Sequence, residues 1–93
     1  MSEKALQIPE RFDFGYHREF TDQYQKLLED NSITGIALDF SRVGYLDSSA
    51  LGMMVLFQKK AKGKSVSVRI RGAKDSAKEI LQIANFDRLF DIS

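Results

Sequence analysis

Residues 36–57 read IALDFSRVGYLDSSALGMMVLF and contain a strand, a short loop and a helix in succession. Apolar residues alternate with other residues over 36–40, which is the period of a strand with one buried face. The segment 50–57 is almost entirely apolar and rich in Leu and Met, which favours a helix that is buried on most sides. We expect Leu51 and Leu56 to lie in the core of the domain.

The same two periods extend towards both ends of the chain. The further expected elements are a strand at residues 5–8, a helix at 18–30 capped by Asn31, a strand at 66–70, and a helix that begins at Ser76-Ala77-Lys78-Glu79 or one turn earlier and ends at Asn85. Pro9 favours an edge position for the first strand, and the alternation of Phe12, Phe14 and Tyr16 is typical of buried strand residues.

This alternation of strands and helices indicates βα units with right-handed crossovers and a mainly parallel sheet. We therefore expect an α/β fold with a mostly parallel or mixed sheet of about four strands and helices mainly on one face. No linker or repeat divides the sequence, so residues 1–93 are expected to form a single small domain.

The composition is that of a globular protein without a strong charge, with 43% apolar residues, 29% charged residues and a net charge of +1. Because the charges nearly balance, we expect no nucleic acid and no membrane as partners. The basic run 59–64 is better explained as cations that complement the dipole at a helix C-terminus. No apolar run is long enough to span a bilayer and there is no cysteine, so we expect a cytoplasmic protein. The chain is nearly neutral and has no obvious self-pairing segment, which favours a monomer.

Groups that move protons or bind metal ions are scarce. His17 is the only histidine, and there is no cysteine or metal-ligand spacing, so no metal site and no cofactor are expected. The phosphate-binding glycine motifs are absent, and neither Ser48 nor Ser49 lies in a G-x-S-x-G context or has a base beside it in sequence. We expect no catalytic residue and no enzyme activity.

The segment Asp47-Ser48-Ser49 stands where the loop 41–46 meets the apolar helix. Asp and Ser are preferred N-cap residues, and a cap contributes about 1 kcal/mol to stability. One cap accounts for only one of three small polar residues in a row. This segment is therefore the candidate functional site.

In these residues the chain resembles the STAS domain family of bacterial anti-sigma factor antagonists. The similarity rests on a strand that ends in Asp39-Phe40-Ser41, followed by a loop and the motif Asp47-Ser48-Ser49-Ala50-Leu51-Gly52. The resemblance implies that Ser48 is phosphorylated, with Ser49 as the weaker candidate. It also implies partner contacts by Asp47, Ser48, Ser49, Ala50 and Gly52. The sequence departs from the family at Ala50, where Gly is usual, and in an N-terminal region that is shorter than a two-strand hairpin.

The resemblance implies a partner-switching regulator that binds an anti-sigma factor or a serine kinase while Ser48 is unphosphorylated. A serine phosphatase would remove the phosphate. The alternative is a ligand- or nucleotide-binding STAS regulatory domain without a phosphoswitch. A small enzyme that uses one of the two serines as a nucleophile is disfavoured because the sequence supplies no base.

Overall fold

The structure is a computed structural model that describes residues 2–92. The strands are β1 (Ser2–Gln7), β2 (Arg11–Phe12), β3 (Ile33–Asp39), β4 (Tyr45–Leu46), β5 (Ser67–Arg71) and β6 (Asp91–Ile92). The helices are α1 (His17–Glu29), α2 (Ser48–Gly63) and α3 (Asp75–Ile83), with 3-10 turns at Phe14–Tyr16 and Phe86–Arg88.

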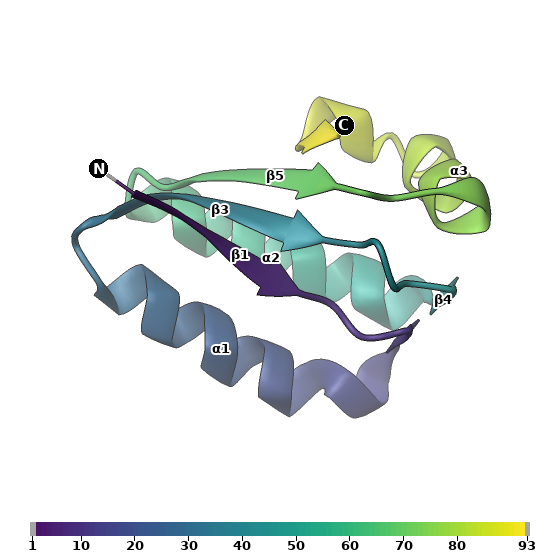
Figure 1. Cartoon of the computed structure of the whole chain (residues 1–93), viewed down its shortest axis with the longest axis horizontal. Coiled ribbons are helices and arrows are strands. Elements are labelled where there is room, and N and C mark those ends of the chain that lie inside the picture. Colours follow the sequence, from purple (N-terminus) through teal and green to yellow (C-terminus); the bar gives the residue numbers. More distant parts are fainter. Residues whose placement is uncertain (1, 93) are drawn as a thin grey trace.

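Four strands form one sheet in the order β1-β3-β5-β6, and every pair in it is parallel (Figure 1). The register places Leu6 of β1 opposite Leu38 of β3, which in turn lies opposite Ile70 of β5. The short strands β2 and β4 form a separate parallel pair at the carboxyl end of this sheet. The expected α/β fold is confirmed, and β1 takes the edge position that Pro9 favours.

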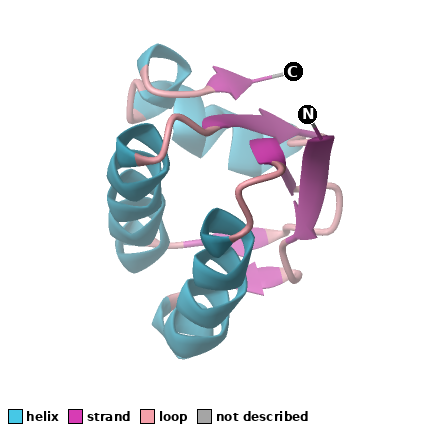
Figure 2. Cartoon of the chain, turned by 90° about the vertical axis from the view of Figure 1, so that its left-hand side faces the viewer, coloured by secondary structure: helices cyan, strands magenta, loops and turns pink. Residues whose placement is uncertain are grey.

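The two faces of the sheet differ in what covers them. Helices α1 and α2 lie against one face (Figures 1 and 2), and the residues that point to it are apolar and buried. On the other face, the guanidinium of Arg69 on β5 donates two hydrogen bonds to the Glu3 carboxylate on β1, at 3.0 and 2.6 Å. The expectation of helices mainly on one face is confirmed.

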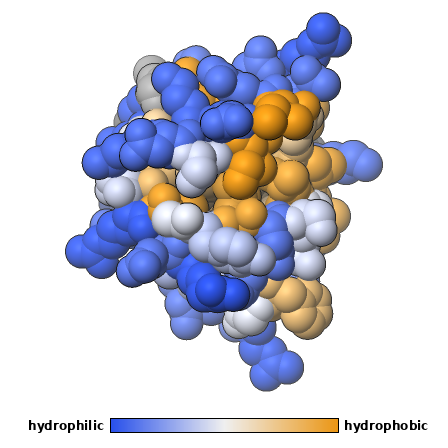
Figure 3. All heavy atoms as spheres, turned by 90° about the vertical axis from the view of Figure 1, so that its right-hand side faces the viewer, coloured by the Kyte–Doolittle hydropathy of each residue, from blue (hydrophilic) through white to orange (hydrophobic). Residues whose placement is uncertain are grey.

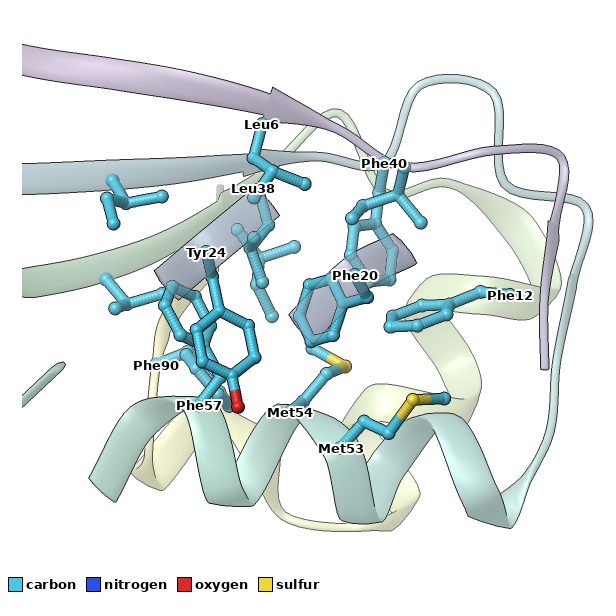
Figure 4. Packing of buried hydrophobic residues seen from close by; sticks show 14 of the residues in the cluster. Leu6, Phe12, Phe20, Tyr24, Leu38, Phe40, Met53, Met54, Phe57 and Phe90 are labelled. Atoms are coloured by element: carbon cyan, nitrogen blue, oxygen red, sulfur yellow. The ribbon is translucent and has the colours of Figure 1, made fainter. Parts of the chain in front are cut away.

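The core between the sheet and the two helices is rich in aromatic side chains (Figure 4). Phe57 of α2 lies edge-on to Phe20 and stacks on Tyr24, with ring centroids 5.7 and 4.7 Å apart. Phe12 and Phe40 continue the cluster towards the carboxyl end of the sheet, 6.1 Å from each other. Such offset and edge-to-face pairs add to the stabilisation that burial provides.

Two expected helix boundaries are wrong. Helix α1 ends at Glu29, and its C-terminal cap is Asp30 rather than Asn31. Asp30 ends the helix because its carboxylate accepts hydrogen bonds from the backbone N–H and the hydroxyl of Ser32, at 2.9 and 2.7 Å. Helix α3 ends at Ile83, with Ala84 rather than Asn85 as its C-terminal cap; it begins at Asp75, within the range expected for its start, with Lys74 at the N-cap position.

The expectation that Phe14 is a buried strand residue is also wrong, because its side chain is 69% exposed. The carboxylate of Asp13 accepts a hydrogen bond from the Gly15 N–H at 3.0 Å and starts a 3-10 turn at this point. Only Phe12, in β2, belongs to an extended segment. Residues 41–46 were expected to form a loop, but Tyr45–Leu46 form strand β4.

Helix α2 is less buried than expected. Its core face consists of small and flexible or aromatic side chains: Ala50, Met53, Met54, Phe57 and Ala61. Leu56 is 46% exposed, so the expectation that it lies in the core is wrong. Each residue turns the helix by about 100°, which rotates Leu56 away from the core that Phe57 enters. Leu51 is half-buried.

Candidate functional site

Asp47 caps the N-terminus of helix α2. Its Oδ1 accepts a hydrogen bond from the Ala50 N–H at 2.9 Å, and its carbonyl accepts one from the Leu51 N–H at 3.2 Å. Its backbone is extended, with φ −114° and ψ −178°, as expected of an N-cap residue. Of the three polar residues in the motif, Asp47 is therefore the cap, and the helix does not require the other two for that purpose.

Ser48 and Ser49 are the first two residues of α2. Ser48 is exposed and Ser49 is half-buried. Neither hydroxyl forms a hydrogen bond with another residue in the described range 2–92. The first N–H groups of a helix have no partner within it and carry the positive end of the helix dipole. An anion attached to Ser48 would therefore lie at the end of the helix that accepts it best.

The loop that leads into α2 is fixed by hydrogen bonds at both ends. The carbonyl of Glu10 accepts hydrogen bonds from the backbone N–H groups of Gly44 and Tyr45, at 2.8 and 3.1 Å. At the end of β3, the Asp39 carboxylate accepts a hydrogen bond from the Ser41 N–H at 2.9 Å. Hydrogen bonding to Ser41 holds the pKa of the Asp39 carboxyl below its usual value. The candidate site is thus presented from a well-anchored strand-to-helix junction.

The remaining residues of the proposed contact set lie on different sides of α2. Ala50 is fully buried, so its side chain lies in the core and takes no direct part in the surface. Gly52 is exposed, and a side chain at this position would meet no other atom within 4 Å. One turn further, Leu56 is exposed beside it, and Tyr45 is 46% exposed in β4. The exposure of Tyr45 and Leu56 was not predicted from the sequence, although the helical period that buries Phe57 turns Leu56 outward.

In the part of the chain that the structure describes, no His, Asp or Glu side chain is hydrogen-bonded to the hydroxyl of Ser48 or Ser49, and the adjacent Asp47 carboxylate accepts from the Ala50 N–H instead. His17 lies on α1, where its ring stacks on Phe14 with centroids 5.5 Å apart. Within residues 2–92, no three His, Cys, Asp or Glu side chains gather in a way that would hold a metal ion. In the same range, no helix is both long enough and apolar enough to cross a bilayer.

Comparison with known proteins decides the family. Residues 2–91 match the family model described as "Mlab, STAS domain". The chain belongs to the STAS domain family. A STAS-domain containing protein of Pseudomonas aeruginosa is 39% identical over 93 residues, which cover 98% of this chain and 88% of that protein.

Solved structures with low sequence identity share the fold. The anti-sigma factor antagonist SpoIIAA in its unphosphorylated form matches with a TM-score of 0.81 at 12% identity, over 100% of this STAS domain and 82% of that chain. The phosphorylated form of the Bacillus protein matches with a TM-score of 0.73 at 12% identity, over 100% and 85%. A sulfate transporter family protein from Wolinella succinogenes matches with a TM-score of 0.79 at 18% identity, over 97% and 75%.

Proposed function

We propose that this STAS domain is a phosphorylation-controlled binding module that acts in partner switching. In this proposal the unphosphorylated domain binds an anti-sigma factor or a serine kinase through the outward face of α2, as a monomer in the cytoplasm. The observation that carries the proposal is that the cap of α2 and the candidate phosphorylation site are different residues. Asp47 caps the helix. The exposed Ser48 hydroxyl forms no hydrogen bond with another residue in the range 2–92, so its modification breaks no contact within the domain.

Phosphorylation of Ser48 is compatible with the fold. A kinase would transfer the γ-phosphoryl group of ATP to the Ser48 Oγ and release ADP, and a serine phosphatase would hydrolyse the ester to restore the hydroxyl. The phosphate adds about −1.5 to −2 charges at a helix N-terminus, where the dipole and the free N–H groups favour an anion. The modification therefore changes the surface of the domain rather than its stability.

The surface beside Ser48 is suited to a protein partner. Gly52 leaves the helix backbone accessible, and Leu56 exposes apolar surface that the core does not use. Tyr45 is also exposed, with the Arg11 guanidinium 4.4 Å from its ring centroid. Figure 3 shows the end of the molecule at the carboxyl ends of the strands, where hydrophobic atoms gather in one area with hydrophilic atoms around it. A partner that binds the outward face of α2 at its first turn would also cover Ser48. A phosphate there would have to be desolvated or paired, so an interface without a matching cation releases the domain.

The first experiment locates the phosphate. The purified domain is incubated with Mg-ATP and a lysate of its own host cells, and the modified residue is identified by mass spectrometry. We expect modification at Ser48 in the wild-type chain and in Ser49→Ala, and none in Ser48→Ala. A phosphate found only at Ser49 or on another residue contradicts the proposal.

The second experiment measures the effect on binding. Ser48→Ala and Ser48→Asp are each used to capture partners from the same lysate, with Ser49→Ala and Ser49→Asp as matched controls one residue away. We expect Ser48→Ala to retain its partner and Ser48→Asp to lose most of it, because a fixed carboxylate imitates part of the phosphate charge. The two Ser49 variants are expected to differ less. Equal capture by both Ser48 variants contradicts the switch.

The likeness to the sulfate transporter family protein favours a second candidate function. In that case the domain is a regulatory module that binds a ligand, such as a nucleotide, and has no phosphoswitch. The two candidates are distinguished by the same variants. Saturable nucleotide binding that is unchanged in Ser48→Asp, without any phosphate on the chain, supports the second candidate.

A further inference from the structure

β1 is the outer strand of the sheet, and one of its two edges has no strand partner within residues 2–92. The N–H groups of Ser2 and Ile8 donate to carbonyls on the β3 side, at 3.1 and 3.0 Å. A strand in a parallel pair bonds its neighbour through alternate residues, so the even-numbered residues of β1 face β3. The backbone N–H and C=O groups of Glu3, Ala5 and Gln7 therefore point to the open edge.

A groove of about 600 Å³ runs along this edge between β1 and α1. Residues 5–9 form one wall, and Glu19, Gln23, Lys26 and Leu27 form part of the other. The spacing of these four residues places them along one side of the helix. The volume lies in the range of about 300–1,000 Å³ that is typical of ligand sites. Figure 1 shows β1 as the outer strand with α1 beside it.

The groove combines an apolar floor with a mainly basic rim. Pro9, Tyr16 and Leu27 are half-buried and supply the accessible apolar surface. Lys26 and Arg42 line the groove, and neither forms an ion pair within 4.0 Å with any residue in the described range. The only carboxylate among the lining residues is Glu19. Arg42 also acts electrostatically on the Asp39 carboxyl outside the lining, but the lining itself carries two cations and one carboxylate, which favours an occupant with acidic residues.

A second copy of this chain is a poor occupant. Its own β1 has an equivalent open edge, but the apolar side chains next to that edge are buried in the core of their own domain. Leu6 is 5% exposed and Ile8 is fully buried, since both pack in the core of their own domain. A paired β1 from another copy would bring Lys4 to the edge rather than a free apolar side chain, and would leave the floor of the groove unfilled.

We propose that the open edge of β1 binds an extended segment of a partner protein as a fifth strand of the sheet. The segment hydrogen-bonds the outward backbone groups of Glu3, Ala5 and Gln7, places an apolar side chain between β1 and α1, and directs acidic residues towards Lys26 and Arg42. This is strand addition, in which the main chain provides affinity and alternate side chains provide specificity. The site lies along the β1 edge, separate from the outward face of α2, and does not depend on phosphorylation of Ser48.

The probe is a random library of displayed peptides of about ten residues, long enough to pair along the whole of β1. Peptides are selected on the immobilised full-length chain, and the enriched sequence is synthesised for titration. Amide chemical shifts of the labelled protein locate its contacts. We expect an enriched sequence with alternating apolar residues and net negative charge, with shift changes in β1 and α1.

Two variants with matched controls test the binding geometry. Ala5→Pro removes one outward N–H while leaving the bonds to β3 intact, and we expect it to weaken binding by about tenfold. Ala5→Thr keeps the N–H and is expected to bind within about twofold of wild type. Lys26→Glu is expected to weaken binding by about threefold, whereas Lys62→Glu, also in the last turn of a helix, leaves it unchanged. Circular dichroism confirms that each variant is folded.

The proposal is overturned by any of three results. The selection enriches no peptide, or the enriched peptide binds Ala5→Pro as tightly as Ala5→Thr, or the shift changes fall on α2 instead of β1 and α1. It is also overturned if sedimentation shows a wild-type dimer that Ala5→Pro converts to a monomer, because a second copy then occupies the edge.

Discussion

Helices α1 and α2 share one aromatic cluster, yet their outward faces differ. α1 buries Phe20, Tyr24 and Leu28, and its exposed positions carry only polar and charged side chains. α2 buries an equally apolar face but leaves Gly52 and Leu56 exposed. An outward leucine contributes little to folding, so the two helices resemble each other in the core and differ in the surface that they present.

The largest expected effect on stability concerns the aromatic cluster through which α1 and α2 contact each other. Phe57→Ala removes a ring that contacts both Phe20 and Tyr24 of α1, and it should lower the free energy of unfolding by about 3–5 kcal/mol. Urea denaturation measures this change. A loss below about 0.5 kcal/mol would mean that the two helices are not joined through this cluster.

The next effect distinguishes the residues at the start of α2. Asp47→Ala removes the side-chain cap and should lower the free energy of unfolding by about 1 kcal/mol. Ser48→Ala should lower it by less than about 0.5 kcal/mol, because its hydroxyl is exposed and makes no protein hydrogen bond. Thermal or urea denaturation of the two variants side by side is the measurement. If Ser48→Ala is the more destabilising, Ser48 acts as the cap.

A smaller effect concerns two carboxylates that belong to turns on either side of β3. Hydrogen bonds from Ser32 lower the pKa of Asp30 after α1, and hydrogen bonds from Ser41 lower the pKa of Asp39 before α2. Because the folded pKa lies below the unfolded value of about 3.9, each carboxylate stabilises the fold above that pH. This contribution is lost as the pH falls through the folded pKa.

We therefore expect the urea midpoint to fall as the solution is acidified below about pH 4. Asp30→Asn and Asp39→Asn should each make that fall shallower, since an amide oxygen accepts the same bonds without titrating. The measurement is the difference in midpoint between pH 7 and pH 3 for each variant and for wild type. A steeper fall in the variants contradicts the assignment of these two groups.

The smallest expected effect on stability has the clearest bearing on function. Leu56→Ala should change the free energy of unfolding by less than about 0.5 kcal/mol, because the side chain is 46% exposed. If the outward face of α2 binds a partner, the same variant should weaken that binding. Leu56→Lys sharpens the test by adding a charge that the interface must desolvate. Unchanged binding by both variants places the partner elsewhere.

The α/β class, the parallel sheet and the order of elements were predictable because the periods of two and 3.6 are clear in residues 33–40, 66–70 and 17–29. The short elements were not. β2 and β4 have two residues each, which is too short for a period, and they exist because Glu10 and Phe12 offer backbone carbonyls to the loop before α2. Tertiary contacts, rather than local pattern, create that pair.

The position of the candidate site was predictable, but which of its residues caps the helix was not. The sequence places Asp47, Ser48 and Ser49 at a helix start, and any of these three residues is a suitable cap. Only the geometry assigns the cap to Asp47 and turns Ala50 into the core. The exposure of Leu56 was hidden because 50–57 is apolar on all sides, so the buried face has to be inferred from the neighbouring elements.

The ion pair between Glu3 and Arg69 disfavours a further layer of structure on the face of the sheet opposite the helices. It crosses the central strand at Gly35, where an added Cβ would lie 3.3 Å from the Ser67 hydroxyl oxygen and 3.5 Å from the Glu3 carboxylate. A further helix would need apolar side chains on this face, and it would have to desolvate both charges. The domain therefore has two layers, one of sheet and one of helices, and a neighbouring protein is more easily bound at the sheet edges, the ends of the strands or the helices.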